Sequence, residues 1–446
     1  MTAGFEAEPY HPSVTGPPAP ERPTGLQYLR LVLLGAAIGI PAAFLAALFL
    51  AAVHGLEHVL WHDIPTDIGK PSPPWYLVIV FPAVGAAICL AARKLLPGDG
   101  GHDPLQGLNK TPTPLSHVPG VVLAALATLG FGAVLGPEAP VLAIGMSVGV
   151  LVTMFVKVGP QGNLVLALAG GFSGLSALFD GPVVAGMFLV ESSEGLGAAL
   201  PPLLVPGLVS AAIGYTIFIG FGHWGGLNAP GLTVPNLPTY SGTHVDGLVI
   251  ALFVGVVAAL LMKYVHRLGE LVEATGLKRL GMPILLLAGG VTVGLLAEFA
   301  DLLGANSQNV LFSGQSSIPS IVASTSTKVV LITLVAKALA YGVSLGCGFR
   351  GGPIFPAIFL GVALASFCVV WFNTSPTLAV AVGAAAGMAA QTRLLVTPPL
   401  LAVLLVGKAG LDTIPAAVLT TVAAWVTLMA LEARAEKRDS TTSSET

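Results

Sequence analysis

From residue 28 to residue 431 the sequence is a nearly continuous series of apolar segments, several of which are too short to cross a lipid bilayer. A helix needs about 20 apolar residues to span the hydrocarbon core, whereas the segments at 182–191 and 397–407 are clearly shorter. The chain contains 55 Gly and 35 Pro residues, and residues of these two types bound the short segments. Helices that enter a membrane and end inside it occur where they line a protected cavity. The pattern therefore predicts a membrane protein with broken and re-entrant helices.

The charge content excludes a soluble domain. Asp, Glu, Lys and Arg make up 9% of the chain and hydrophobic residues 54%, whereas ordinary soluble domains have about 25% charged residues. So few charges could not cover a water-exposed surface. The net charge of −3 argues against a nucleic-acid partner. Cys89, Cys347 and Cys368 lie in apolar segments and indicate no disulfide framework. We expect an all-α polytopic membrane protein that contacts the lipid bilayer.

One membrane domain, residues 27–431, lies between two short tails. Residues 1–26 are rich in Pro and predict a disordered cytoplasmic tail, and residues 432–446 form a short charged cytoplasmic tail. The apolar segments lie at about 28–53, 75–96, 118–135, 139–157, 161–178, 182–191, 199–221, 244–265, 281–303, 328–346, 354–372, 376–390, 397–407 and 411–431. Lys and Arg collect in cytoplasmic connections, so we place both termini, 93–117 and 263–280 inside, and 54–74, 222–243 and 304–327 outside.

A motif occurs in both halves of the membrane domain. Residues 136–145 and residues 352–361 both read G-P-x-x-P-x-x-x-x-G. Further matches follow in the same order, pairing Gly170 with Gly383, Gly174 with Gly387, and Pro182 with Pro398 or Pro399. Interrupted segments at equivalent places are typical of transporters built from inverted repeats, here at about 75–221 and 281–431. Chance recurrence in a Gly- and Pro-rich chain is the alternative.

The two Gly-Pro motifs can form an anion site from backbone alone. Pro suits the first turn of a helix, and a preceding Gly allows a sharp turn and a close approach to the backbone. The free N–H groups and the helix dipole then give positive potential at the helix tip. Two such tips that point to the bilayer midplane from opposite halves would bind an anion without Lys or Arg.

Two acidic residues lie in apolar sequence. Glu138 occupies one of the predicted helix tips, and a carboxylate inside a membrane is a functional candidate. When ionised it can take the place of a transported anion, and when protonated it loses that attraction. The alternative is an acidic first-turn residue that favours the helix start. Glu191 ends another apolar segment; it is a candidate for a proton pathway or a residue at the water boundary.

These motifs resemble, in order and spacing, those of the CLC family of chloride channels and proton/chloride antiporters over about residues 30–430. Residues 136–140 stand where the family has G-[KR]-E-G-P, residues 352–356 where it has G-x-F-x-P, and residues 179–191 resemble F-N-A-P-x-x-G-x-x-F-x-x-E-E. The resemblance implies a homodimer with a pore in each subunit, Glu138 as the gate, and anion coordination by the amides of Ile354 and Phe355. The candidate anion-binding residues are Gly101, His102, Asp103, Gly136, Pro137, Ala139, Gly352, Pro353, Ile354 and Phe355.

The chain departs from the family pattern at three places. Residues 100–104 read G-G-H-D-P where the family has G-S-G-I-P, so Gly101 replaces the anion-contacting serine, and His102 and Asp103 introduce titratable groups. The G-x-P-x-Y motif, whose tyrosine contacts the anion, has no convincing match. The paired glutamates read Glu191-Ser192, so proton coupling and passive conduction both stay open. No regulatory CBS pair is present in this sequence.

Histidines suggest a metal site that we do not assign from sequence. His54, His58 and His62 recur every four residues, with Glu57 and Asp63 nearby, and imidazoles at that spacing can bind Zn²⁺. Because they fall where the first span leaves the membrane, an ordinary interfacial role is favoured. We expect neither metal nor cofactor. H-E-x-x-H is absent from the sequence, and the two G-x-S-x-G matches, at 145–149 and 342–346, lie within apolar segments, so we do not expect an enzyme.

The sequence thus predicts a CLC-type anion transporter or channel in the plasma (inner) membrane. Chloride or a similar small anion would pass through each subunit of a homodimer, either passively through a voltage- or pH-gated pore or in exchange for protons. The alternative is an inverted-repeat carrier of another solute, such as a cation admitted by Asp103 and Glu191.

Overall fold

The computed structural model describes residues 25–108, 111–192, 200–221, 223–226 and 232–444. These residues form helices joined by loops. Among them, the only bridges between extended backbone segments join Gly136 with Gly352 and Phe221 with Trp224. The expected all-α fold is confirmed for the described chain. Most of the predicted N-terminal tail, up to residue 24, lies outside the described residues.

The helices follow the predicted apolar segments closely. In the first half they are α1 (Gly25–His58), α2 (Ile64–Asp67), α3 (Trp75–Leu95), α4 (Val118–Leu129), α5 (Glu138–Thr153), α6 (Gly159–Leu178), α7 (Pro182–Glu191) and α8 (Leu200–Ile219). In the second half they are α9 (Val245–Arg279), α10 (Gly281–Leu302), α11 (Ser307–Val310), α12 (Ile318–Val322), α13 (Thr327–Gly346), α14 (Ile354–Phe372), α15 (Pro376–Thr392), α16 (Thr397–Val406) and α17 (Ile414–Ser444). Short helical segments of other types connect several of them: η1 (Val59–Asp63), η2 (Pro104–Gln106), η3 (Leu115–His117), η5 (Gln315–Ser317) and η6 (Gly407–Thr413).

Two helices extend beyond their apolar segments. We predicted that the apolar part of α9 ends near residue 265, but the helix continues through the basic connection to Arg279. The next helix, α10, begins in a new direction at Gly281, whose φ is +73°. In the same way α17 continues through the charged C-terminal tail to Ser444. Charged residues with good helix propensity extend a helix into water until Gly or Pro interrupts it.

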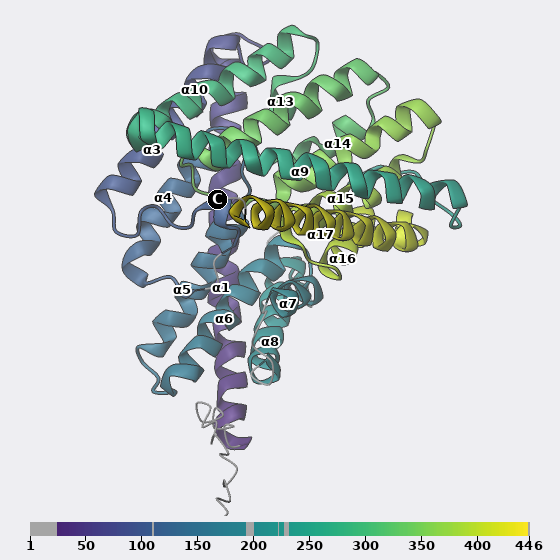
Figure 1. The fold of residues 1–446 in the computed structure, drawn as a ribbon. Coiled ribbons are helices and arrows are strands. Elements are labelled where there is room, and N and C mark those ends of the chain that lie inside the picture. The colour runs from purple at the N-terminus through teal and green to yellow at the C-terminus, as the bar shows by residue number, and fades with distance from the viewer. Residues whose placement is uncertain (1–24, 109–110, 193–199, 222, 227–231, 445–446) are drawn as a thin grey trace, which may run out of the picture.

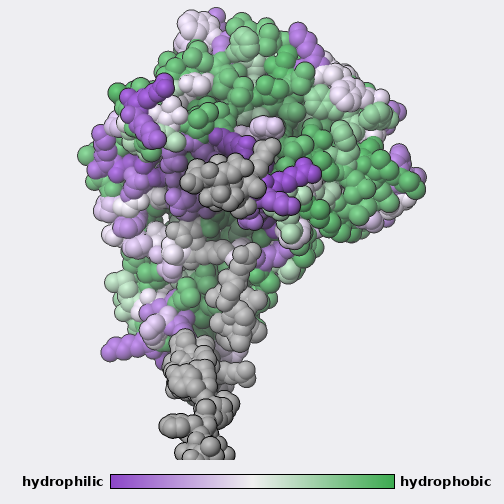
Figure 2. Space-filling model, viewed as in Figure 1, coloured by the Kyte–Doolittle hydropathy of each residue, from purple (hydrophilic) through white to green (hydrophobic). Residues whose placement is uncertain are grey.

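The lengths and surface of the helices fit a bilayer. Seven helical segments of the described chain are long and apolar enough to cross a membrane, and others of 10–17 residues are apolar but shorter. Large apolar side chains are exposed along many of them, including Phe44 on α1, Phe253 on α9 and Leu331 on α13. Figure 2 shows apolar residues over broad areas of the surface. In water such a surface would be unfavourable, whereas lipid tails cover it without cost.

The helices gather into two groups that meet at the centre of the molecule. Figure 1 shows α1, α5, α6 and α8 together in one region, and α9, α13, α14, α15 and α17 in another. The helix α3 from the first half packs against α10 from the second. Residues that are distant in the sequence therefore face each other where the groups meet.

Glycines bring two equivalent helix pairs into close contact. A Cβ at Gly145 of α5 would overlap the carbonyl of Gly170 in α6, and a Cβ at Gly361 of α14 would overlap the carbonyl of Gly383 in α15. Small residues at such crossings allow helix backbones to approach within a membrane. Both helix pairs directly follow a copy of the G-P-x-x-P motif, so the local packing is alike in the two halves.

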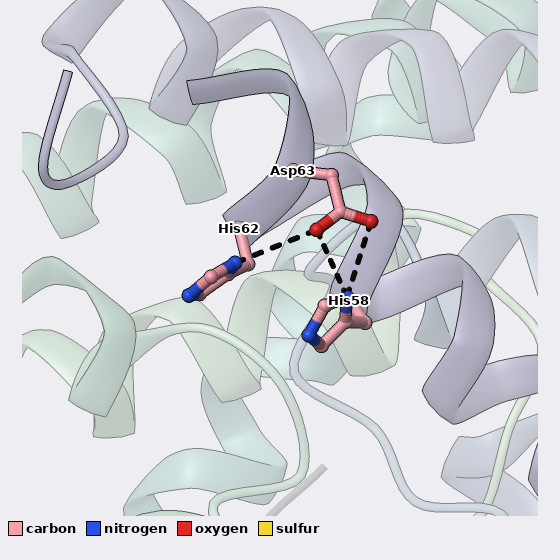
Figure 3. A group of neighbouring side chains, drawn as sticks. All are labelled: His58, His62 and Asp63. Carbon is pink, nitrogen blue, oxygen red and sulfur yellow. Dashed lines mark hydrogen bonds and ion pairs between the residues drawn. The ribbon is translucent and has the colours of Figure 1, made fainter. Parts of the chain in front are cut away.

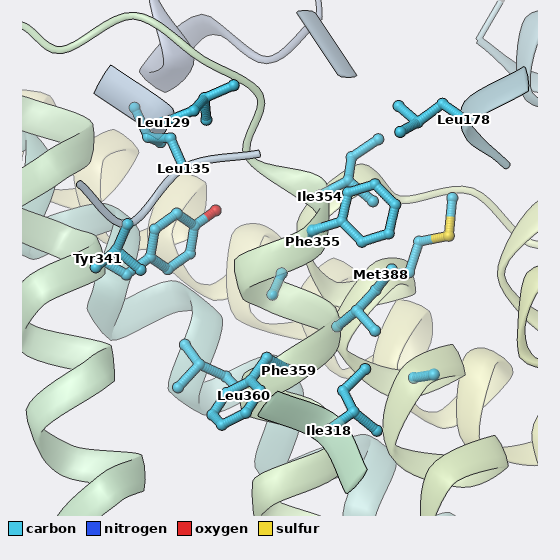
Figure 4. Packing of buried hydrophobic residues seen from close by; sticks show 14 of the residues in the cluster. Leu129, Leu135, Leu178, Ile318, Tyr341, Ile354, Phe355, Phe359, Leu360 and Met388 are labelled. Atoms are coloured by element: carbon cyan, nitrogen blue, oxygen red, sulfur yellow. The ribbon is translucent and has the colours of Figure 1, made fainter. Parts of the chain in front are cut away.

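A buried lysine fixes the connection that precedes α13. Lys337 has no exposed surface, and its Nζ donates to the backbone carbonyls of residues 309, 310, 311 and 312 at 2.8–3.1 Å. These carbonyls end the short helix α11, where no helical partner is available. Nζ also lies 4.6 Å from the centroid of the Phe359 ring on α14. The side chain thus joins three elements around the packed core drawn in Figure 4.

We expect Lys337→Met to destabilise the protein, because methionine fills a similar volume but leaves four buried carbonyls without a donor. The loss should be about 2–4 kcal/mol in the free energy of unfolding. Thermal denaturation in detergent, followed by size-exclusion chromatography, measures it. Lys328→Met, at an exposed position of the same helix, serves as the control and should leave the midpoint unchanged. Equal midpoints for both variants would contradict the stabilising role of Lys337.

Candidate functional site

The two Gly-Pro motifs lie side by side at the centre of the molecule. Gly136 and Gly352 exchange both backbone hydrogen bonds, each with an N···O distance of 2.6 Å. Directly after this bridge the chain turns into α5 on one side and into α14 on the other, with Pro137 and Pro353 in the capping positions. Both helices therefore begin at the same point, and their positive N-terminal ends lie close together.

Glu138 is the first residue of α5 and is completely buried. Its Oε1 accepts a hydrogen bond of 2.7 Å from the backbone N–H of Phe355 in the first turn of α14. Its Oε2 is buried and has no hydrogen-bond partner among the described residues. A carboxylate from one half of the chain is therefore bound by the helix tip of the other half, with one oxygen available to another donor.

The glycines of the bridge make room for this carboxylate. A Cβ at Gly136 or at Gly352 would overlap Oε2 of Glu138. Neither glycine has a positive φ, so the requirement here is space and not backbone conformation. Any larger residue at either position would expel the glutamate side chain from its place.

A buried tyrosine supports the second motif from behind. The hydroxyl of Tyr341 on α13 donates to the carbonyl of Pro353 at 2.7 Å and lies 3.2 Å from Oε1 of Gln391. Gln391 Nε2 in turn lies 3.1 Å from Nε2 of His266 on α9. Figure 4 shows the tyrosine hydroxyl on the side of Ile354 and Phe355. The family's C-terminal tyrosine has no match here, and sequence reasoning missed this one because α13 carries no recognisable motif.

A cavity of about 440 Å³ reaches the start of α5 from the loop between α3 and α4. Gly101, His102 and Asp103 line it, together with Ala139 and Arg350. The sequence-predicted G-G-H-D-P segment and the glutamate motif therefore border one space. The cavity gives the helix tips a wide, polar approach from this end of α3.

His102 and Asp103 are partly engaged within their own loop. A nitrogen of the His102 ring contacts the carbonyl of Gly107, and the Asp103 carboxylate accepts from the amide of Leu105 at 3.1 Å. Burial lowers the pKa of His102, and this effect outweighs the opposing hydrogen bond to Gly107 and the charge of Asp103. A neutral imidazole is therefore favoured at neutral pH, and His102 adds little charge to the cavity.

The positive charge at this cavity comes from a cluster that sequence reasoning missed. Asp99 accepts from Arg93 at 2.9 and 2.8 Å and also pairs with Arg350, whose Nε donates to the Asp99 carbonyl at 3.1 Å. Arg93 reaches the carbonyl of Gly348 at 2.7 Å. One carboxylate thus pairs with two buried arginines. The cluster therefore carries an excess of positive charge beside the larger cavity, which Asp103 also lines.

A second cavity, of about 60 Å³, adjoins the start of α5 from another side. Leu135 and Pro137 line it, together with His54 and Glu57 from the end of α1. The end of α1 and the loop after α3 lie at opposite ends of α3, whose 21 residues extend about 30 Å. The two cavities therefore approach Glu138 from opposite sides of the protein.

Glu191 lies away from this centre, at the end of α7. Its two oxygens accept from the amides of Leu395, Val396 and Thr397 at 2.6–2.7 Å and from the Thr397 hydroxyl at 2.6 Å. The carboxylate thus caps the N-terminus of α16. Ser192 follows it and brings no second carboxylate.

The structure assembles most of the predicted site residues at one point. The bridge and the two helix starts bring together Gly136, Pro137, Glu138, Ala139, Gly352, Pro353, Ile354 and Phe355. Gly101, His102 and Asp103 border the larger cavity, and Glu191 stands apart. Helix tips that meet between two cavities, in an all-helical protein with helices long enough to cross a membrane, are typical of proteins that transport small solutes.

The comparisons with known proteins identify the class of transporter. The family described as voltage gated chloride channel matches residues 84–428, and the chain belongs to this family, the CLC family. The protein is therefore an integral membrane protein for anion transport, as a channel or by proton exchange. Members of this family are transporters and channels. The alternative of a carrier for a cation or another solute is not favoured.

Curated relatives are similar over most of the chain. YfeO of Escherichia coli (strain SMS-3-5 / SECEC), a protein named for ion transport, is 28% identical over 360 residues, which are 77% of this chain and 79% of that protein. YfeO of Escherichia fergusonii gives the same values.

Solved structures support the fold. A slow cyanobacterial Cl⁻/H⁺ antiporter has a TM-score of 0.74 at 17% identity, covering 90% of this chain and 95% of that one. A CLC-type fluoride/proton antiporter has a TM-score of 0.68 at 20% identity, covering 91% and 96%.

We expect Asp99→Asn to lower the thermal midpoint in detergent by about 2–4 °C, because two buried arginines lose their shared carboxylate. Although burial acts in the opposite direction, the hydrogen bonds and charges of Arg93 and Arg350 lower the pKa of Asp99. The stabilisation is therefore present at neutral pH, above the ordinary aspartate pKa of about 3.9, and is lost as pH falls through the lowered value. The gap between wild type and variant should shrink on acidification.

Thermal scans over a pH series measure this gap, with Asp67→Asn at an exposed position as the control. A gap that is constant with pH would contradict the ion-pair interpretation.

Proposed function

We propose that the protein conducts chloride or a similar small anion between the two cavities, past Glu138, and that Glu138 is the gate. One observation carries this proposal: the Glu138 carboxylate is fully buried, accepts from the Phe355 amide and leaves Oε2 without a partner. A buried carboxylate at two helix tips occupies a place suited to an anion.

The gate would work by exchange of one anion for another. In the ionised form the carboxylate holds the helix tips and excludes the transported anion. Protonation removes the charge, so the attraction to the Phe355 amide weakens and the side chain can leave. The vacated place then has the same donors for chloride. Arrival of an anion from either cavity and protonation of Glu138 are therefore linked events.

The anion-binding surface would come mainly from backbone. The amides of Ile354 and Phe355 at the start of α14 would bind the anion, with Gly136, Pro137, Ala139, Gly352 and Pro353 shaping the space. Gly101, His102 and Asp103 would border its approach through the larger cavity, where Arg350 attracts anions and Asp103 opposes them. Chloride is the anion of the family description, and one structural neighbour is a fluoride/proton antiporter.

Oligomeric state and orientation belong to the same proposal. As family membership implies, we expect a homodimer with one pathway in each subunit, in the plasma (inner) membrane with both termini in the cytoplasm. Light scattering of the purified protein in detergent measures the dimer, and protease access to tags at each end of the chain in vesicles measures the orientation.

We expect Glu138→Gln to make chloride flux faster and nearly independent of pH, because glutamine keeps the shape of the side chain but cannot ionise. Gly352→Ala should slow the flux, since its Cβ would overlap Oε2 of Glu138 and fill the place that chloride would take. Chloride release from liposomes with purified protein measures both. Gly225→Ala, where a Cβ would meet nothing within 4 Å, is the matched control. Unchanged pH dependence in Glu138→Gln would exclude Glu138 as the gate.

Proton exchange, as opposed to passive conduction, would use Glu191 as the inner carboxylate. Chloride and pH electrodes together distinguish the two modes, because only an exchanger moves protons uphill as chloride leaves. If protons pass through Glu191, Glu191→Gln should abolish proton movement and leave chloride flux, since the glutamine oxygen can still accept from two of the amides at the start of α16. Full proton movement in Glu191→Gln would remove Glu191 from the pathway.

A further inference from the structure

The end of α1 brings together three side chains that the proposed anion pathway does not use. After His58 the helix continues as a π-helical turn, η1, and then as the short helix α2. In an α-helix, residues five apart differ in direction by about 140°, so His58 and Asp63 would point apart. The wider π-helical turn brings residues five apart onto one face, and this register places Asp63 against His58.

The three side chains converge in a geometry suited to a metal ion. The Nδ1 atom of His58 lies 3.2 Å from both carboxylate oxygens of Asp63, and the Nδ1 atom of His62 lies 3.5 Å from Oδ1. One ligand atom from each residue falls within a group no wider than 4.8 Å. Figure 3 shows one nitrogen of each ring facing the carboxylate. Ligands of a tetrahedral zinc ion are roughly 3.3 Å apart, given Zn–N and Zn–O distances of about 2.0–2.1 Å.

Among the described residues, the Asp63 carboxylate pairs only with His58 and His62. Asp63 occupies the position before α2, yet its side chain makes no capping hydrogen bond there. The side chains of His58, His62 and Asp63 are 64%, 71% and 46% exposed, so an ion can reach them. The helical segment from Gly25 to Asp67 has 43 residues, about twice what a span requires, which lets this end project beyond the lipid core.

The ligand types select the class of metal. Two imidazoles and one carboxylate suit Zn²⁺ and other divalent transition ions such as Ni²⁺ and Co²⁺. Ca²⁺ and Mg²⁺ prefer all-oxygen sites. Water can complete the coordination, because the exposed face of the group is open.

We propose that His58, His62 and Asp63 bind a divalent transition-metal ion of the zinc class, and that the bound ion slows anion passage through the adjacent small cavity. The three proposed ligands lie about one helical turn from residues that line this cavity. His54 and Glu57, one turn earlier on α1, line it together with Pro137, and His54 Nδ1 lies 3.4 Å from Glu57 Oε2. An ion that cross-links His58 to η1 would restrain this wall of the cavity and so hinder passage through it. The effect on passage rests on the proposed function, whereas the metal site does not.

Binding can be tested independently of transport. The full chain, purified in detergent with any affinity tag removed, is titrated with ZnCl₂ by isothermal calorimetry. We expect one zinc ion per chain in the wild type, and at least tenfold weaker binding in the His58→Ala/His62→Ala variant. His223→Ala, another exposed histidine, is the matched control and should bind as the wild type does. MgCl₂ should give no comparable binding.

Equal zinc affinity in the wild type and the double variant would overturn the metal site. The thermal midpoints of the two proteins in the absence of zinc show whether the double variant is folded. Because all three side chains are exposed, we expect the midpoints to agree. Asp63→Asn supplies a second test, since it removes the charged ligand and leaves both imidazoles in place. It should weaken zinc binding by a similar factor.

Chloride efflux from liposomes tests the effect on passage. We expect zinc to slow efflux by the wild type and by His223→Ala, and to leave the double variant unaffected. Zinc that binds but leaves wild-type efflux unchanged would overturn the effect on passage and leave the site established. If no variant moves chloride in the absence of zinc, the proposed function fails, and calorimetry alone still decides the metal site.

Discussion

The carboxylate of Glu138, bound by the Phe355 amide of the other half of the chain, is the contact around which the molecule is organised. It needs two helices that begin at one point, and the reciprocal bonds between Gly136 and Gly352 bring their starts together. It also needs glycine at both positions of the bridge, because any Cβ would occupy the place of the carboxylate. The close glycine crossings of α5 with α6 and of α14 with α15 then hold each helix start in position.

Buried charge in this protein is consistently paired or hydrogen-bonded. Lys337 donates to backbone carbonyls that end a helix, Arg350 and Arg93 share Asp99, and Glu191 caps α16. An unpaired charge in low dielectric would cost several kcal/mol. Among the charged side chains of the described residues, only Glu138 keeps a buried oxygen without a partner. That difference separates the group we assign to function from those that stabilise the fold.

Much of the fold follows from local sequence. Helix bounds agree closely with the apolar segments, because Gly and Pro interrupt the helices where the sequence places them. The Gly-Pro motifs and Glu138 were predictable for the same reason. The Asp99–Arg350 pair, the Lys337 contacts and the Tyr341 contact with Pro353 were not, since each joins residues distant in the chain and follows no pattern. The π-helical turn at residues 59–63 also escaped prediction, because a change of helical register leaves the residue types unchanged.

The two copies of the Gly-Pro motif differ where it matters most, because the position of Glu138 in the first copy is occupied by Ile354 in the second. The backbone is nearly symmetric about the bridge, but the single carboxylate and the cavities of about 440 and 60 Å³ are not. An anion that arrives from the wide, arginine-lined side and one that arrives past His54 meet different fields and different widths. On the pathway proposed above, transport in the two directions should therefore differ in rate under equal and opposite gradients.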